Sequence, residues 1–99
     1  VTPITPYYVM KVGHVPLIPY DRPGAPAVAE QVADLAGKVR GVLLERLGPV
    51  VWHESVSSAA FALEELEETA KLWLMLRDKT TPLSAVAIDD LRQAFKARW

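Results

Sequence analysis

The sequence contains no cysteine and only two histidines, and none of its apolar runs approaches the roughly 20 residues that a helical membrane span requires. The absence of cysteine excludes disulfide bonds, thiolate zinc sites and thiol nucleophiles together. The n-region and h-region of a signal peptide are also missing. We therefore expect a cytoplasmic protein that makes no contact with a membrane.

An excess of basic residues is lacking as well. The chain has 11 Lys and Arg against 12 Asp and Glu, which gives a net charge of −1. Proteins that hold a nucleic-acid backbone or an anionic lipid surface use clusters of positive charge. The charge balance thus predicts that neither is a partner.

The residues that are present favour one small folded domain. Hydrophobic residues make up 51% and charged residues 23% of the 99 residues, which is enough to form a core. A domain of this size buries only roughly two-thirds of the surface of its unfolded chain, so neighbouring subunits matter for its stability. Because the chain opens at Val1 without an initiator Met, we expect a fragment or a truncated piece of a longer protein.

Local patterns in the first part of the chain predict two strands and a helix. Aromatic and β-branched residues favour a strand at 7–12, and prolines make 15–20 an edge or irregular strand. A loop follows at 21–26. Pro26 suits the first position of a helix, and Gly37 suits its end.

The second part predicts a hairpin and two helices. A buried strand is expected at 41–47, a turn at Gly48–Pro49 and a returning strand at 50–52. A long helix is expected at 56–77 and a linker at 79–82. The predicted order is therefore β-β-α-β-β-α-α, with one further helix at the C-terminus.

Both late helices carry capping residues and apolar faces. Ser55 is the expected cap of the long helix and Ser84 that of the last one. We expect Glu67 and Lys71 to form an ion pair on the long helix. The buried face predicted for the long helix comprises Ala59, Leu63, Leu66, Ala70 and Trp73, and that of the last helix comprises Ile88, Leu91, Phe95 and Trp99.

Candidate catalytic or metal-binding groups are few. His14 and His53 match neither HExxH nor HxH, so each is either a ligand or base, or simply a histidine at the end of a strand. An acidic run on the long helix fits a solvated face rather than a carboxylate metal site. It comprises Glu64, Glu65, Glu67 and Glu68.

Other reactive patterns have simpler explanations. The serines beside His53 lie where a helix cap belongs, and no third group is present to hold a base. The five glycines match neither a dinucleotide-binding motif nor a P-loop. The three tryptophans could be platforms for a ligand, but two of them lie on apolar helix faces and are more simply core or interface residues. The residues meant are Ser55, Ser57 and Ser58, and Trp52, Trp73 and Trp99.

Three stretches together resemble a known family. They are Thr5–Gly13 with Val15–Tyr20, then Arg22–Gly24 before the first helix, and finally Leu43–Val51 with Ala62–Leu72. Over about residues 2–77 the series resembles the C-terminal half of the class II aldolase/adducin family. Within the family it is most similar to the branch of 3-oxo-tetronate 4-phosphate decarboxylases.

The resemblance implies a fold, an assembly and a chemistry. The fold would be α/β, the C-terminal part of a three-layer α/β/α domain with a mainly antiparallel sheet, usually assembled as a homo-oligomer. Residues 1–78 would belong to this domain, and 79–99 would form a linker and a C-terminal helix. The full-length family uses a divalent metal, commonly zinc, held by three histidines, with a glutamate as acid/base. Its substrate would be a sugar-acid phosphate.

The chain departs from the family at a ligand position. The glutamate, the His-x-His pair and the phosphate loop belong to the family's N-terminal half. The third histidine belongs in a Leu-Leu-Ala-Asn-His-Gly-Pro stretch, where this chain has Leu47. Either Glu45, His53 or the upstream glutamate replaces that ligand, or the metal has been lost and the fold serves binding or assembly.

We therefore expect a fragment of a metal-dependent lyase that is inactive by itself. No residue of the chain is assigned a catalytic or metal-binding role, and no metal is expected on the chain alone. The alternative is a non-catalytic binding or assembly module. If the chain is instead a self-standing short protein, an exposed apolar patch and oligomerisation are expected.

Overall fold

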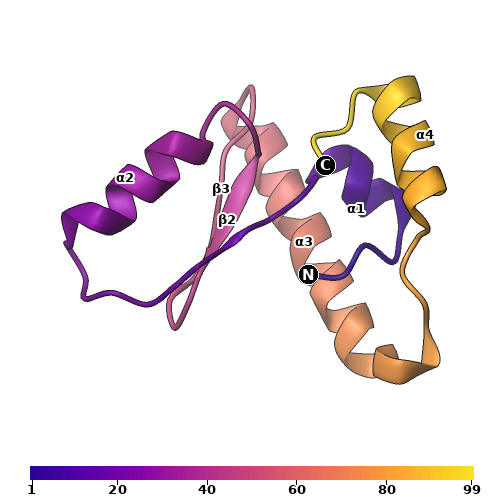
Figure 1. Ribbon diagram of the computed structural model, residues 1–99, viewed down its shortest axis with the longest axis horizontal. Coiled ribbons are helices and arrows are strands. Elements are labelled where there is room, and N and C mark those ends of the chain that lie inside the picture. The colour runs from indigo at the N-terminus through magenta and orange to yellow at the C-terminus, as the bar shows by residue number, and fades with distance from the viewer.

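The computed structural model describes residues 1–99, which form four α-helices and a three-stranded sheet (Figure 1). In chain order the elements are α1 (Pro6–Lys11), β1 (Leu17–Ile18), α2 (Pro26–Leu35), β2 (Gly41–Leu44), β3 (Gly48–Val51), α3 (Val56–Leu76), the 3-10 turn η1 (Arg77–Lys79) and α4 (Ala85–Phe95). The strand order is β1-β2-β3, with β1 parallel and β3 antiparallel to β2. The α/β class is confirmed, and the sheet is mixed, with one parallel and one antiparallel pairing.

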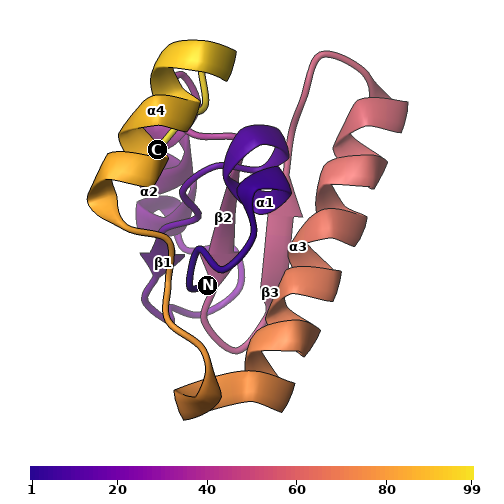
Figure 2. The same cartoon turned by 90° about the vertical axis from the view of Figure 1, so that its right-hand side faces the viewer.

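Helices cover both faces of the sheet (Figures 1 and 2). On one face, Ile18, Val39 and Val42 form a small buried cluster beneath the apolar side of α2. On the other face, Leu43 contacts the larger core that α1, α3 and the C-terminal residues build. The alternation of side chains along β2 thus divides the apolar residues between two cores. None of the helices combines the length and the continuous apolar character that crossing a bilayer requires.

The first element is a helix, so the strand predicted at 7–12 is wrong. Thr5 caps the helix, because its hydroxyl accepts a hydrogen bond from the Tyr8 amide at 3.2 Å, and Pro6 occupies the first turn. Tyr8, Val9 and Val12 are fully buried in the larger core. This packing outweighs the β preference of the residues. The observed order is therefore α-β-α-β-β-α-α.

The hairpin of β2 and β3 is confirmed, but its turn lies earlier than predicted. The Leu47 amide donates to the Leu44 carbonyl at 3.0 Å, so the turn precedes Gly48 and Pro49, which belong to β3. Pro49 is opposite Leu43, whose amide donates away from β3 to the Pro16 carbonyl. Pro49 therefore faces the free edge of the sheet, where its missing N–H costs nothing.

The long helix α3 begins as predicted, since the Ser55 hydroxyl accepts from the Ser58 amide at 3.0 Å. Its buried residues are Ala62, Leu66 and Thr69, so only Leu66 of the predicted face is fully buried. Leu63 is 37% exposed, because α1 and β3 cover only a narrow strip of the helix. Lys71 pairs with Glu68 at 3.2 Å and not with Glu67.

The last helix is capped by Ser84 as predicted. Ile88 and Leu91 contact the larger core, whereas Phe95 is 58% exposed, contrary to the prediction. The helix ends at Phe95, and the left-handed backbone of the C-cap Lys96 (φ 55°, ψ 37°) redirects the chain inward. As a result, Ala97 and Trp99 reach the core in place of Phe95.

Candidate functional site

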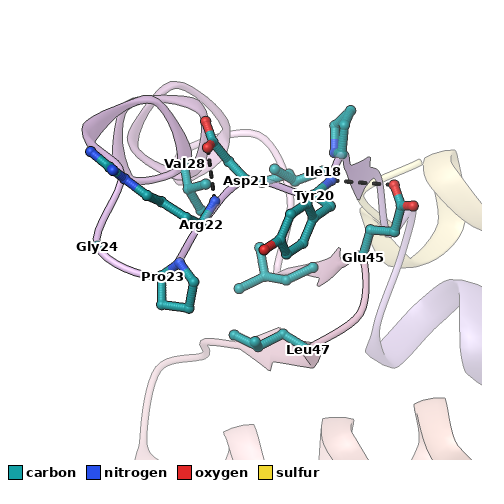
Figure 3. A pocket seen from close by; sticks show the side chains of 11 residues that line it. Ile18, Tyr20, Asp21, Arg22, Pro23, Gly24, Val28, Glu45 and Leu47 are labelled. Atoms are coloured by element: carbon teal, nitrogen blue, oxygen red, sulfur yellow. Dashed lines mark hydrogen bonds between the residues drawn. The ribbon is translucent and has the colours of Figure 1, made fainter.

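The position of the missing histidine lies beside a hollow of about 180 Å³ between the β2–β3 turn and the segment that follows β1. Figure 3 shows Tyr20, Glu45 and Leu47 around this hollow, with Arg22 on the side opposite Glu45. We call it the turn hollow. It is the place in the fold where the resemblance would locate metal chemistry.

Backbone pairing fixes the two walls of the turn hollow. The Glu45 amide donates to the Ile18 carbonyl at 3.0 Å, which extends the β1–β2 pairing. The Tyr20 amide in turn donates to a Glu45 carboxylate oxygen at 3.2 Å. Glu45 is therefore held against the Tyr20 segment, and its carboxylate lies at the rim of the hollow (Figure 3).

The turn itself contains an unusual backbone. Arg46 has φ of 71°, in the left-handed region that a side chain with a Cβ seldom adopts. The family stretch has Asn at this position, and Asn tolerates the left-handed region better than Arg. The turn therefore requires Arg46 to hold a conformation that the asparagine of the family stretch adopts more readily.

Leu47 is 71% exposed and offers no lone pair to a metal. Glu45 and Asp21 also line the turn hollow, but Asp21 accepts a hydrogen bond from the Arg22 amide at 2.8 Å. Nowhere in the chain do three or more His, Asp or Glu residues gather as a cluster that could hold a metal ion. The residues present thus do not fit a divalent metal by themselves.

The two histidines lie away from the turn hollow. His53 lines a different hollow with Arg40, Trp52 and Arg98, beyond the opposite end of β3, and its Nδ1 accepts from the Glu54 amide at 2.9 Å. His14 lies edge-on to Trp99, with ring centroids 5.3 Å apart. Of the two replacement ligands within the chain, the structure brings only Glu45 to Leu47.

The remaining candidates have structural roles. Ser55 caps α3 and donates to the Ser58 hydroxyl at 3.0 Å, and neither is hydrogen-bonded to His53. The four glutamates of α3 form no metal-binding cluster. Trp52 donates from its indole nitrogen to the Ala36 and Val39 carbonyls, and so fixes the turn after α2.

The sequence did not predict the buried hydroxyl of Tyr8, whose ring packs against Trp99 at the other end of the chain. Tyr8 is 0% exposed and its hydroxyl has no hydrogen-bond partner. Its ring lies edge-on to Trp99 at 5.9 Å, and the His14 amide donates to the Arg98 carbonyl at 2.8 Å. Burial raises the pKa of Tyr8 to about 12. The only sequence signal for its burial was the helical spacing of apolar residues within 7–12, a segment whose composition favours a strand.

Comparison with known proteins gives a consistent answer. The sequence profile described as "Class II Aldolase and Adducin N-terminal domain" matches residues 1–74. A 3-oxo-tetronate 4-phosphate decarboxylase of Cupriavidus necator is 68% identical over 98% of this chain and 47% of its own length. One from Escherichia coli K12 is 48% identical over 93% of this chain and 44% of its own length.

Solved structures agree with the sequence matches. YgbL of Escherichia coli, described as a putative aldolase/epimerase/decarboxylase, shares 48% identity with a TM-score of 0.86, over 93% of this chain and 45% of that one. YgbL of Klebsiella pneumoniae shares 43% identity with a TM-score of 0.87 and the same coverage. The chain therefore spans about half the length of the relatives that it matches.

Proposed function

Because the chain belongs to the class II aldolase and adducin family, we propose that it is one part of a lyase that breaks a carbon–carbon bond in a phosphorylated sugar acid. The 68% identity with a 3-oxo-tetronate 4-phosphate decarboxylase supports this substrate class. Loss of carbon dioxide from such a substrate would leave a triose phosphate. The reaction is proposed for the complete protein, of which this chain represents about half.

The complete protein would have the three-layer α/β/α fold, a mainly antiparallel sheet and a homo-oligomeric assembly in the cytoplasm. Residues 1–78 would be the C-terminal half of the aldolase-like domain, and 79–99 its linker and final helix. The helices on both faces of the present sheet support the layered arrangement.

The chain by itself should be inactive, and the observation that carries this proposal is Leu47. An exposed leucine stands at the family's ligand position, and no other cluster of ligating residues replaces it. We therefore derive no step of the reaction through a metal held by this chain. In the complete protein, Glu45, which lines the same hollow as Leu47, is this chain's candidate for a substitute ligand.

The test compares the chain alone with a joined protein. The joined protein fuses this chain to the segment of the Cupriavidus necator relative that lies outside the matched part. Carbon dioxide release from 3-oxo-tetronate 4-phosphate, with zinc or manganese added, should be absent for the chain alone. Turnover by the purified 99-residue chain would refute the proposed dependence on a second half.

Leu47→His in the joined protein tests the ligand position. We expect this variant to bind about one zinc ion per chain more tightly than the parent, because the histidine supplies a third imidazole. Metal content after dialysis, measured by plasma mass spectrometry, gives the result. The matched control is Val50→His, which places the new imidazole at a partly exposed position of β3 outside the turn. Equal zinc gains in both variants would contradict the assignment.

The alternative function is a non-catalytic binding or assembly module, and Leu47 also favours it. The same joined proteins separate the two functions. If the Leu47 parent releases carbon dioxide, the lyase has found another ligand. If only Leu47→His does so, the chain has the fold of a lyase but serves as a module.

A further inference from the structure

The chain exposes more surface than a self-contained protein of its mass. Its accessible surface is 6733 Å² at 10.9 kDa, whereas a folded monomer of that mass exposes about 5,600 Å². The radius of gyration is 13.8 Å, against about 12.6 Å for a compact chain of this length. The excess accessible surface is therefore about 1,100 Å². Each partner in a standard interface buries about 800 Å², so this excess is large enough for one partner to cover.

Part of the exposed apolar surface lines a continuous depression along one side of α3, where Val1, Leu63 and Leu74 are exposed. Two adjoining hollows of about 470 and 590 Å³ share Val1 and Ala70. Val15, Leu43, Leu63 and Leu66 line the first of them, and Trp73 and Leu74 line the second. We call this surface the α3 groove. Glu67 is the only residue with a charged side chain that lines it.

We propose that the α3 groove is the docking surface for the complementary half of the class II aldolase fold. The inference rests on the proposed function only in taking the chain as part of that fold. The chain superposes on 45% of YgbL with a TM-score of 0.86, so more than half of that protein lies outside the matched part. That remainder must pack against the matched half to make one domain.

A second copy of the chain is the competing occupant. A homodimer through α3 would bury apolar surface too, but each copy would still lack the other half of its fold. The complementary half accounts for both the length of the relatives and the apolar character of the groove. It is therefore the occupant to which the proposal commits.

Binding is tested by co-expressing the chain with a tagged complementary segment of the Cupriavidus necator relative. We expect a one-to-one complex by light scattering after affinity purification. Leu63→Asp should weaken the complex by about tenfold or more, because it places a charge in the apolar interface. Phe61→Asp is the control, since Phe61 is 64% exposed on the same helix and does not line the groove.

Each other outcome overturns the proposal. Either no complex forms with the parent chain, or Phe61→Asp and Leu63→Asp weaken it equally, or the chain forms a homodimer that Leu63→Asp dissociates.

A second measurement applies if the complementary segment does not fold when it is separate from the chain. In the joined protein, Leu63→Asp should lower the melting temperature more than it does in the isolated chain, while Phe61→Asp should affect both alike. Equal effects of Leu63→Asp would again refute docking. Neither readout needs turnover, so a complex that forms without decarboxylating its substrate would refute the proposed activity and leave the docking surface intact.

Discussion

At the scale of single residues, two positions adopt locally unfavourable states that the packing of the rest of the fold stabilises. Arg46 keeps a left-handed backbone in the β2–β3 turn, and Tyr8 buries a hydroxyl without a partner. Neither could be identified from the sequence. Leu47, in contrast, could be singled out from one short stretch, because leucine cannot serve as the metal ligand that the family resemblance implies at this position.

Arg46→Asn should stabilise the chain by about 1 kcal/mol, since a left-handed residue with an ordinary side chain costs about 1–2 kcal/mol and Asn relieves part of this cost. Urea denaturation followed by circular dichroism measures the change. Arg46→Ala is the control at the same position, because alanine keeps the Cβ and loses the charge. If alanine stabilises the chain as much as asparagine, charge and not backbone strain explains the gain.

Tyr8 should make the chain sensitive to alkali. Its pKa is raised to about 12 by burial, from 10.0 for the free side chain, so the folded state holds the proton more tightly than the unfolded state. The stability that this provides is complete below pH 10 and is lost as pH rises towards 12. Tyr8→Phe should therefore flatten the fall in unfolding free energy between these values.

The control for this titration is Tyr7→Phe, which removes an exposed hydroxyl from the same helix. At neutral pH we expect Tyr8→Phe to be as stable as the parent or more stable, because it removes an unpaired buried hydroxyl. A parallel alkaline decline in the parent and Tyr8→Phe would show that another group governs it.

At the scale of elements, α2, α3 and α4 were predictable from the sequence and α1 was not. Ser55 and Ser84 mark the starts of α3 and α4 because a short hydroxyl side chain satisfies a free amide locally. In α1 the cap is also local, but the residues Tyr7–Val12 favour a strand in isolation. Only contacts with α3 and α4, far along the sequence, select the helix.

The contact between α1 and the C-terminal residues gives a prediction at this scale. A Cβ added at Gly13, whose φ is +84°, would lie 2.5 Å from the Arg98 carbonyl oxygen. Gly13→Ala should cost at least about 1 kcal/mol through backbone strain and more through this clash. Denaturant titration of the full chain and of a chain ending at Ala97 separates the two contributions.

The substitution should cost less in the shortened chain, because the carbonyl oxygen is gone and only the strain remains. Gly24→Ala serves as a control for strain, since its φ is +86° and no atom lies near the added Cβ. The same cost for Gly13→Ala in both chains would mean that the C-terminal residues do not rest on Gly13.

At the scale of the whole molecule, the sequence predicted an α/β chain that is part of a longer domain. The structure adds an apolar groove along α3. The hydrophobic composition indicated an exposed apolar patch only for a chain that stands by itself. It could not indicate where, because the face of α3 that α1 and β3 leave uncovered depends on how these elements cross. Helical spacing placed Leu63 inside the core, whereas it lies on the α3 groove.

The outward-facing Pro49 has a consequence for how such a half-fold avoids self-association. An open sheet edge next to apolar residues is a template for strand-by-strand aggregation, and natural proteins guard such edges with gatekeeper residues. Pro49 takes this role on β3, since it removes an N–H that an incoming strand would need. A partner is thereby directed to side-chain contacts along α3, and fibril-like stacking through β3 is disfavoured.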